Sequence, residues 1–254
     1  MSGQEALSSV ASGTRPKPAG EHGWAIATVL TLSAATGLVE AVCFAHLGGV
    51  FAAFVTGTVV LAGLRAAGGG SGALIPYGVA FAGFLAGGLL GGSLIGASGA
   101  AGAVAGTLRG LAGEFALLVL AVIADAVIPH RGGLVALGLL SAGMAVQYSA
   151  TKNLRVADLG FAAPTGLIHG LAHDFARRVP VRLPRKLLAP LTLLAGACVG
   201  GFVSVESIPG ALLIGSGLVA AAAVTLAAGS RRAATQGSSI ARNWRAEADR
   251  RSGW

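Results

Sequence analysis

Eight long apolar runs separated by short turns constrain the fold of this chain more than any other feature. A helix that crosses a bilayer needs about 20 apolar residues, and roughly 17 to 25 are tolerated. The runs at 50–67 and 157–176 are the weaker candidates, because very short connections bound them and the second contains several polar residues. Each of these two either crosses or re-enters the membrane, shielded from lipid by its neighbours. The eight runs are 24–45, 50–67, 74–97, 111–128, 133–150, 157–176, 187–204 and 210–228.

The composition favours lipid as the solvent of these runs. Hydrophobic residues make up 54% of the chain and charged residues only 11%, whereas a soluble domain carries about 25% charged residues. So few charges could not cover the surface of a soluble fold of this size. The runs are continuous, unlike the alternating strands of about ten residues in a membrane barrel. We therefore expect an all-α, polytopic transmembrane bundle of six to eight helices, whose backbone bonds are made internally.

Basic residues flank the apolar runs and predict the topology. The stretch 1–23 is polar and is expected to be a disordered N-terminus. Five basic residues stand between 177 and 186, and six arginines occupy the tail 229–254. Positive charge beside a span favours the cytoplasmic face and anionic lipid headgroups. Both termini are therefore expected in the cytoplasm, on either side of a transmembrane domain at 24–228. The net charge of +8 is assigned to lipid and not to nucleic acid.

An internal repeat divides the transmembrane domain into halves, 24–128 and 133–228. Two pairs of stretches carry the comparison: Thr56-Gly57 with Thr165-Gly166, and residues 37–40 with 143–147. If the two weaker runs cross the membrane, the halves run parallel. If the two weaker runs re-enter, each half has three crossings and the halves have opposite orientations. Both symmetries occur in transporters, which place their sites at the repeat interface.

Polar side chains inside the apolar runs are the candidates for function, since an ionisable group within a membrane is costly. Glu40 is a candidate proton carrier or hydrogen-bond acceptor. A Thr-Gly step can free backbone carbonyls and offer a hydroxyl, as in broken transporter helices. Gln147 can donate and accept a hydrogen bond at once. The candidate solute-binding residues are Glu40, Thr56, Gly57, Gln147, Thr165 and Gly166.

Each candidate also has a structural interpretation. Glu40 could lie at a helix end near the headgroups, and a Thr-Gly step could be a packing notch. For Gln147 the interhelical bond is the preferred interpretation. His169 and His173 are read as a polar helix face that approaches the basic block. Glu114 and Asp125 are assigned structural roles near the two ends of the run 111–128.

Glycine and cysteine complete the expectations. Among the 41 glycines, Gly83, Gly87 and Gly91 follow the small-xxx-small spacing that brings helices together, either within the chain or between copies in an oligomer. Cys43 and Cys198 are read as small buried hydrophobes.

The sequence contains no metal-ligand spacing, phosphate-binding loop or nucleophile elbow. We therefore expect no enzymatic activity, no cofactor and no metal.

Three stretches resemble the YoaK-like family, a group of uncharacterised bacterial multi-pass inner-membrane proteins. They are residues 37–61, 143–150 and 164–174. The sequence departs from the family pattern at Glu40, where the family typically has Asp, and at Thr58 and Tyr148, where it tends to Asn. The resemblance implies a polytopic α-helical fold in a bacterial inner membrane, and no established substrate.

These observations favour a small-solute permease or exporter with a site near the bilayer midplane, between the two repeats. The alternative is a non-transporting membrane protein, such as a scaffold, a partner subunit or an envelope-assembly factor. A cavity that reaches Glu40 would favour transport, and a closed bundle there would favour the alternative.

Overall fold

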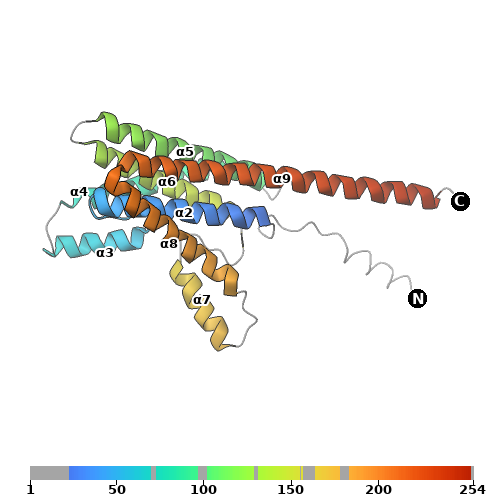
Figure 1. The fold of residues 1–254 in the computed structure, drawn as a ribbon, viewed down its shortest axis with the longest axis horizontal. Helices are drawn as coiled ribbons and strands as arrows, with labels where there is room; N and C mark the ends of the chain where they lie inside the picture. The colour runs from blue at the N-terminus through green and yellow to red at the C-terminus, as the bar shows by residue number, and fades with distance from the viewer. Residues whose placement is uncertain are drawn as a thin grey trace.

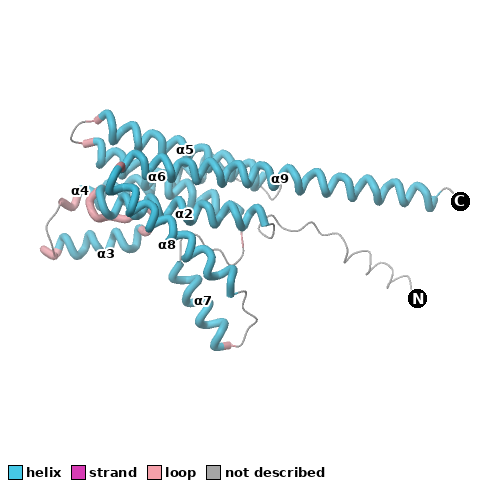
Figure 2. Tube along the Cα trace, viewed as in Figure 1, coloured by secondary structure: helices cyan, strands magenta, loops and turns pink. Residues whose placement is uncertain are grey.

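The computed structural model describes residues 23–69, 73–96, 102–128, 131–154, 156, 164–177 and 183–252. For residues 164, 165, 167, 171, 174, 183–186 and 236–252 it describes the backbone alone. Throughout these ranges the regular structure is helical (Figure 2). The helices are α2 (Gly23–His46), α3 (Val55–Ala66), α4 (Ile75–Ile95), α5 (Ala103–Val127), α6 (Gly132–Leu154), α7 (Pro164–Ala176), α8 (Leu183–Glu206) and α9 (Ile208–Ser252).

Six of these helices are long and apolar enough to cross a membrane: α2, α4, α5, α6, α8 and α9. The expectation of an all-α polytopic bundle is therefore confirmed. The short helix α3 has 12 residues and α7 has 13. At 1.5 Å per residue they measure about 18 and 20 Å, well short of the roughly 30 Å hydrocarbon core. Among the described residues, the runs at 50–67 and 157–176 thus hold only helices too short to span, which favours the six-crossing arrangement.

Two features differ from the sequence prediction, the residue at which α5 begins and the exposure of Cys198. Helix α5 begins at Ala103, eight residues before the predicted start of the run at 111. Glu114 therefore lies in the middle of α5, and its predicted place near a helix end is wrong. Cys198 is exposed on the outer face of α8, so only Cys43 is buried within the protein.

The chain enters and leaves the bundle at the same end. Helix α2 begins there, and α9 continues beyond the other helices on that side (Figure 1). Its 45 residues correspond to about 67 Å, more than twice the hydrocarbon thickness. The tail predicted at 229–254 is therefore a helical extension of the last span up to Ser252.

The two halves pack in matching ways. Helix α4 lies along α6, and its counterpart α8 lies along α2. Helix α5 packs on α6, as α9 packs on α2, and the short helices α3 and α7 contact α4 and α8 in turn. Three crossings per half give the halves opposite orientations, so the bundle is an inverted repeat.

Sequence identities at one constant shift support this structural repeat, and of the two pairs of stretches in the sequence analysis only the Thr-Gly pair keeps that shift. Leu85-Ala86-Gly87 and Gly91-Gly92 in α4 recur as Leu194-Ala195-Gly196 and Gly200-Gly201 in α8. Each glycine stands 109 positions after its counterpart (87 and 196, 91 and 200), and the same shift relates the two Thr-Gly steps. At this shift Glu40 corresponds to Ser149 and not to Gln147.

The repeated glycines form the two closest helix contacts. A Cβ atom at Gly83 or Gly87 would overlap the backbone of Gly138 or Ala142 in α6. A Cβ atom at Gly196 or Gly200 would overlap the backbone of α2 in the same way. Gly91 faces Ser149 and Val146 of α6. The spaced glycines of α4 are therefore used within the chain, the first of the two arrangements predicted for them.

The six-crossing topology predicts which positions share a side of the membrane. In a Cys43→Ala, Cys198→Ala background, cysteines at Ala67 and Ser207 should react with an impermeant maleimide from one side, and a cysteine at Arg177 from the other. All three positions are exposed at helix ends. Labelling of right-side-out and inverted vesicles measures this. Reaction of the cysteines at Ala67 and Ser207 from opposite sides would show instead that α3 crosses.

Candidate functional site

Helix α3 is re-entrant: it lies at the edge of the bundle, begins part-way along it and ends on the side where α2 ends (Figure 2). The residues before and in its first turn lie beside Thr36 of α2. Thr36 precedes the end of α2 by ten residues, which corresponds to about 15 Å, or half of the hydrocarbon core. The N-terminus of α3 therefore lies near the expected midplane.

Glu40 fixes this N-terminus. The backbone N–H groups of Ala52 and Phe54 donate to its carboxylate at 2.9 and 3.1 Å, and that of Ala53 donates to the same oxygen as Phe54. These donors precede α3, where a helix has no internal acceptors for them. The negative charge also complements the positive end of the helix dipole. Glu40 is 4% exposed, so it is an internal cap of α3 and not a headgroup contact.

Thr58 closes the loop that leads into α3. Its hydroxyl donates to the carbonyl of Phe51 at 2.8 Å and accepts from the N–H of Phe51 at 3.0 Å. The ring of Phe51 stacks on Phe44 of α2, with centroids 5.0 Å apart, and meets Phe54 edge-on at 5.9 Å. The loop is thus held by both polar and aromatic contacts, and Thr58 is a residue that the sequence analysis did not include in the site.

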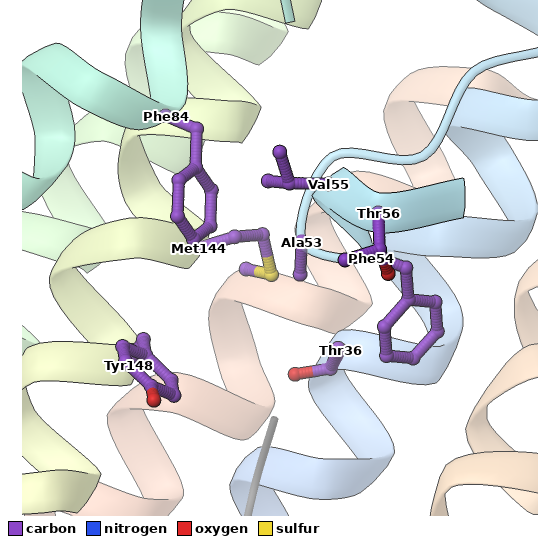
Figure 3. A pocket seen from close by; sticks show the side chains of 8 residues that line it. All are labelled: Thr36, Ala53, Phe54, Val55, Thr56, Phe84, Met144 and Tyr148. Carbon is purple, nitrogen blue, oxygen red and sulfur yellow. The ribbon is translucent and has the colours of Figure 1, made fainter. Parts of the chain in front are cut away.

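A cavity of about 260 Å³ opens beside the N-terminus of α3 (Figure 3). Three hydroxyl-bearing side chains line it, Thr36 from α2, Thr56 from α3 and Tyr148 from α6. The rest of the lining is apolar and consists of Ala53, Phe54, Val55, Phe84 and Met144. The cavity therefore combines a few hydrogen-bonding groups with apolar walls, as small-molecule sites do.

Gln147 lies near this cavity without lining it. Its side-chain N–H donates to the carbonyl of Leu32 at 2.9 Å, and its carbonyl oxygen accepts from the Thr36 hydroxyl at 3.4 Å. The side chain is fully buried. Gln147 thus joins α2 to α6, which was the preferred interpretation of this residue.

The second Thr-Gly step is placed differently from the first. Thr56 is exposed to the cavity, and Gly57 packs under the ring of Phe51. Gly166 is exposed on α7, which packs chiefly on α8 at the edge of the bundle (Figure 1). The side chain of Thr165 lies outside the described residues. The structure therefore places Thr56 on the cavity lining, whereas Glu40 and Gly57 lie beside the cavity without lining it, so the cavity does not reach Glu40. Gly166 is not shown at this site.

His169 and His173 share an exposed face of α7. Their rings stack with centroids 6.1 Å apart, one helical turn from each other. The side chain of Asp174 is not among those described.

The repeat explains one difference between α3 and α7. Ser149, which corresponds to Glu40, donates its hydroxyl to the carbonyl of Ala145 in its own helix, at 3.1 Å. It has no carboxylate with which to accept several backbone N–H groups. Among the described contacts, an acid thus anchors only the short helix of the first half, α3.

The fold and the cavity define a class: a polytopic membrane protein of two inverted three-span repeats, with a small cavity beside a re-entrant helix. Residues 28–225 match the family described as protein of unknown function, DUF1275, and this match covers most of the chain. The chain therefore belongs to that family. Comparison with curated proteins and with solved structures gives no match.

Proposed function

We propose that this protein is a permease for a small uncharged solute, which binds in the cavity between α2, α3, α4 and α6. The observation that carries the proposal is the anchored N-terminus of α3 with a cavity directly beside it. Re-entrant helices at a repeat interface form the solute sites of many transporters. Irregular backbone at membrane depth, such as residues 52–54, is tolerated where it is buried in protein or lines a cavity.

The chemistry of the cavity limits the solute. Its three hydroxyl groups come from Thr36, Thr56 and Tyr148, and no charged side chain lines it. Glu40 already neutralises the positive end of α3, so an anion would find no unmatched charge there. A volume of about 260 Å³ is just below the range of roughly 300–1,000 Å³ for drug-sized ligands. The solute is therefore small and uncharged, with one or two hydroxyl or amide groups and an apolar part.

The proposal includes the orientation in the membrane. With six crossings, the start of α2 and the end of α9 lie on the same side as the basic residues between 177 and 186. Arg65 and Arg131 are the basic residues of the opposite side. By the positive-inside rule, both termini are cytoplasmic. We place the protein in a bacterial inner membrane on the family resemblance.

Removal of hydroxyl groups from the cavity should slow transport without unfolding the protein. The purified protein is reconstituted into liposomes, which are then mixed with a concentrated solution of glycerol, lactamide or N-acetylalanine amide. The liposomes shrink and re-swell as the solute enters, and stopped-flow light scattering follows the re-swelling. At least one solute should enter faster than in empty liposomes. Thr56→Val with Tyr148→Phe should lower that rate about tenfold or more, because two hydrogen bonds are worth roughly 1–3 kcal/mol.

Thr225→Val is the matched control, since this threonine is exposed on α9 and bonds its own helix. Its rate should equal that of the unaltered protein. Equal rates for the cavity double variant and this control, with a solute that the protein does move, would rule out the cavity as the site.

A further inference from the structure

Glu114 is a buried acid that does not line the proposed cavity. It lies in the middle of α5, fully buried, and neither carboxyl oxygen has a hydrogen-bond partner. Eleven residues precede it in the helix and thirteen follow, so it stands about 16–20 Å from either end. This places Glu114 near the expected midplane.

The surroundings of Glu114 provide no counter-charge. Helix α5 packs on α6, α9 and α4. The titratable or charged side chains of their described spanning parts are Tyr77 in α4, Tyr148 and Lys152 in α6, and Arg231 and Arg232 at the end of α9. None of them bonds Glu114. On α5 itself, Arg109 and Asp125 lie more than one helical turn away.

Glu40 and Glu114 are both buried acids, but only Glu40 has hydrogen-bond partners for its carboxylate. Glu40 accepts three backbone N–H bonds and so has a complete structural role. Glu114 accepts none, and an unpaired carboxylate within a bilayer costs several kcal/mol more than the neutral acid. A metal ion would need several further oxygen ligands, which the apolar neighbours Leu111 and Leu118 do not supply. The ligand that fits a lone carboxyl in such a place is a proton.

Helix α6 connects this acid to the cavity. Gly143 faces Glu114, since a Cβ atom there would lie 3.9 Å from Cγ of Glu114. The next residue, Met144, lines the cavity, as does Tyr148 one turn later. Solute in the cavity and a proton on Glu114 therefore act on the same turn of α6, from two faces.

We propose that Glu114 is the proton-binding site of this protein, and that its proton is exchanged with water when the contact between α5, α6 and α9 opens during transport. The proton enters from the aqueous phase on one side, is held on a carboxyl oxygen of Glu114, and leaves to the other side. The inference rests on the proposed permease function and specifies its coupling ion.

Infrared difference spectroscopy tests the site without any solute. The purified protein should show the carbonyl band of a protonated carboxylic acid without hydrogen bonds. Glu114→Gln should lose this band, and Asp125→Asn, an acid-to-amide change in the same helix, should keep it. The band should shift in D₂O when a pH gradient is imposed across proteoliposomes. A band that Glu114→Gln retains, or one that never exchanges under the gradient, would overturn the proposal.

The flux assay tests the coupling. For whichever of glycerol, lactamide and N-acetylalanine amide the protein moves, a pH gradient should accelerate entry severalfold, and Glu114→Gln should abolish the acceleration while downhill entry continues. An entry rate that does not change with the pH gradient would refute the coupling and leave the permease function standing. If none of the three solutes is moved, the failure concerns the permease function, and the infrared result still decides whether Glu114 carries an exchangeable proton.

Discussion

Glu40→Ala should release α3 from the bundle. The substitution removes the acceptor of three backbone N–H groups, those of Ala52, Ala53 and Phe54. Hydrogen bonds to a charged group contribute about 1.5–3 kcal/mol each, and a buried donor left unpaired adds a desolvation penalty. Breaking a buried network of this kind costs about 3–5 kcal/mol. The expected loss is large enough to populate a state with α3 undocked.

The measurement is the reactivity of a cysteine that docking protects. Ala53 is half-buried between Glu40 and the cavity, so an Ala53→Cys protein without its native cysteines should react slowly with N-ethylmaleimide. Adding Glu40→Ala should raise the rate about a hundredfold, because 3 kcal/mol corresponds to two powers of ten. The apparent Tm in detergent should fall as well.

Two further variants separate the carboxylate from general damage. Glu40→Asp keeps a charged acceptor and should retain most of the protection. Glu206→Ala removes an exposed acid at the end of α8 and should change neither the rate nor the Tm. Unchanged reactivity in Glu40→Ala would mean that the loop contacts of Thr58 and Phe51 hold α3 without the acid.

Much of the fold was predictable because the bilayer allows few solutions. Long apolar runs in a chain with 11% charged residues can only be helices that satisfy their own backbone. The two runs that hold only short helices were also recognisable as the weaker spans, from the short connections of 50–67 and the polar residues of 157–176. Their lengths as helices depend on where each chain segment turns inside the membrane, and hydropathy does not report that position.

The site was predictable in part. Glu40 and Thr56 were identified from polarity within apolar runs, and the structure places them around one re-entrant helix. The function of Glu40 as a cap was not predictable, because its donors belong to a loop that is 12–14 residues away in the sequence. The cavity residues Thr36 and Tyr148 come from different halves, and only packing brings them together.

Glu114 was misjudged for a local reason. Arg109 and Gly110 look like the end of a loop, and a span that starts after them puts Glu114 in its first turn. Helix α5 instead begins at Ala103, and the side chain of Arg109 bonds the carbonyl of Ala105 in its own helix, at 3.4 Å. A span of 25 residues that ends at Val127 places the acid near its middle.

Gly87→Ala should be among the most destabilising single-methyl changes in the chain. The added Cβ atom would overlap the backbone of Ala142 in α6, which has no rotamer with which to move aside. Helices α4 and α6 would have to separate along their whole contact, and overpacking of this kind costs about 1–3 kcal/mol, with backbone overlap at the upper end. Because the cavity lies between α2, α3, α4 and α6, the same shift should disturb it.

The neighbouring Gly88 provides the matched control. A Cβ atom at Gly88 meets nothing within 4 Å, and alanine is the better helix former by up to about 1 kcal/mol. Gly88→Ala should therefore leave the apparent Tm unchanged or raise it, while Gly87→Ala lowers it. In α8 the inverted repeat predicts the same contrast between Gly200, which contacts the backbone of Leu38, and Gly201, which has open space. Thermal unfolding of the four variants in one detergent tests the prediction, and equal effects within each pair would show that these glycines do not set the distance between the helices.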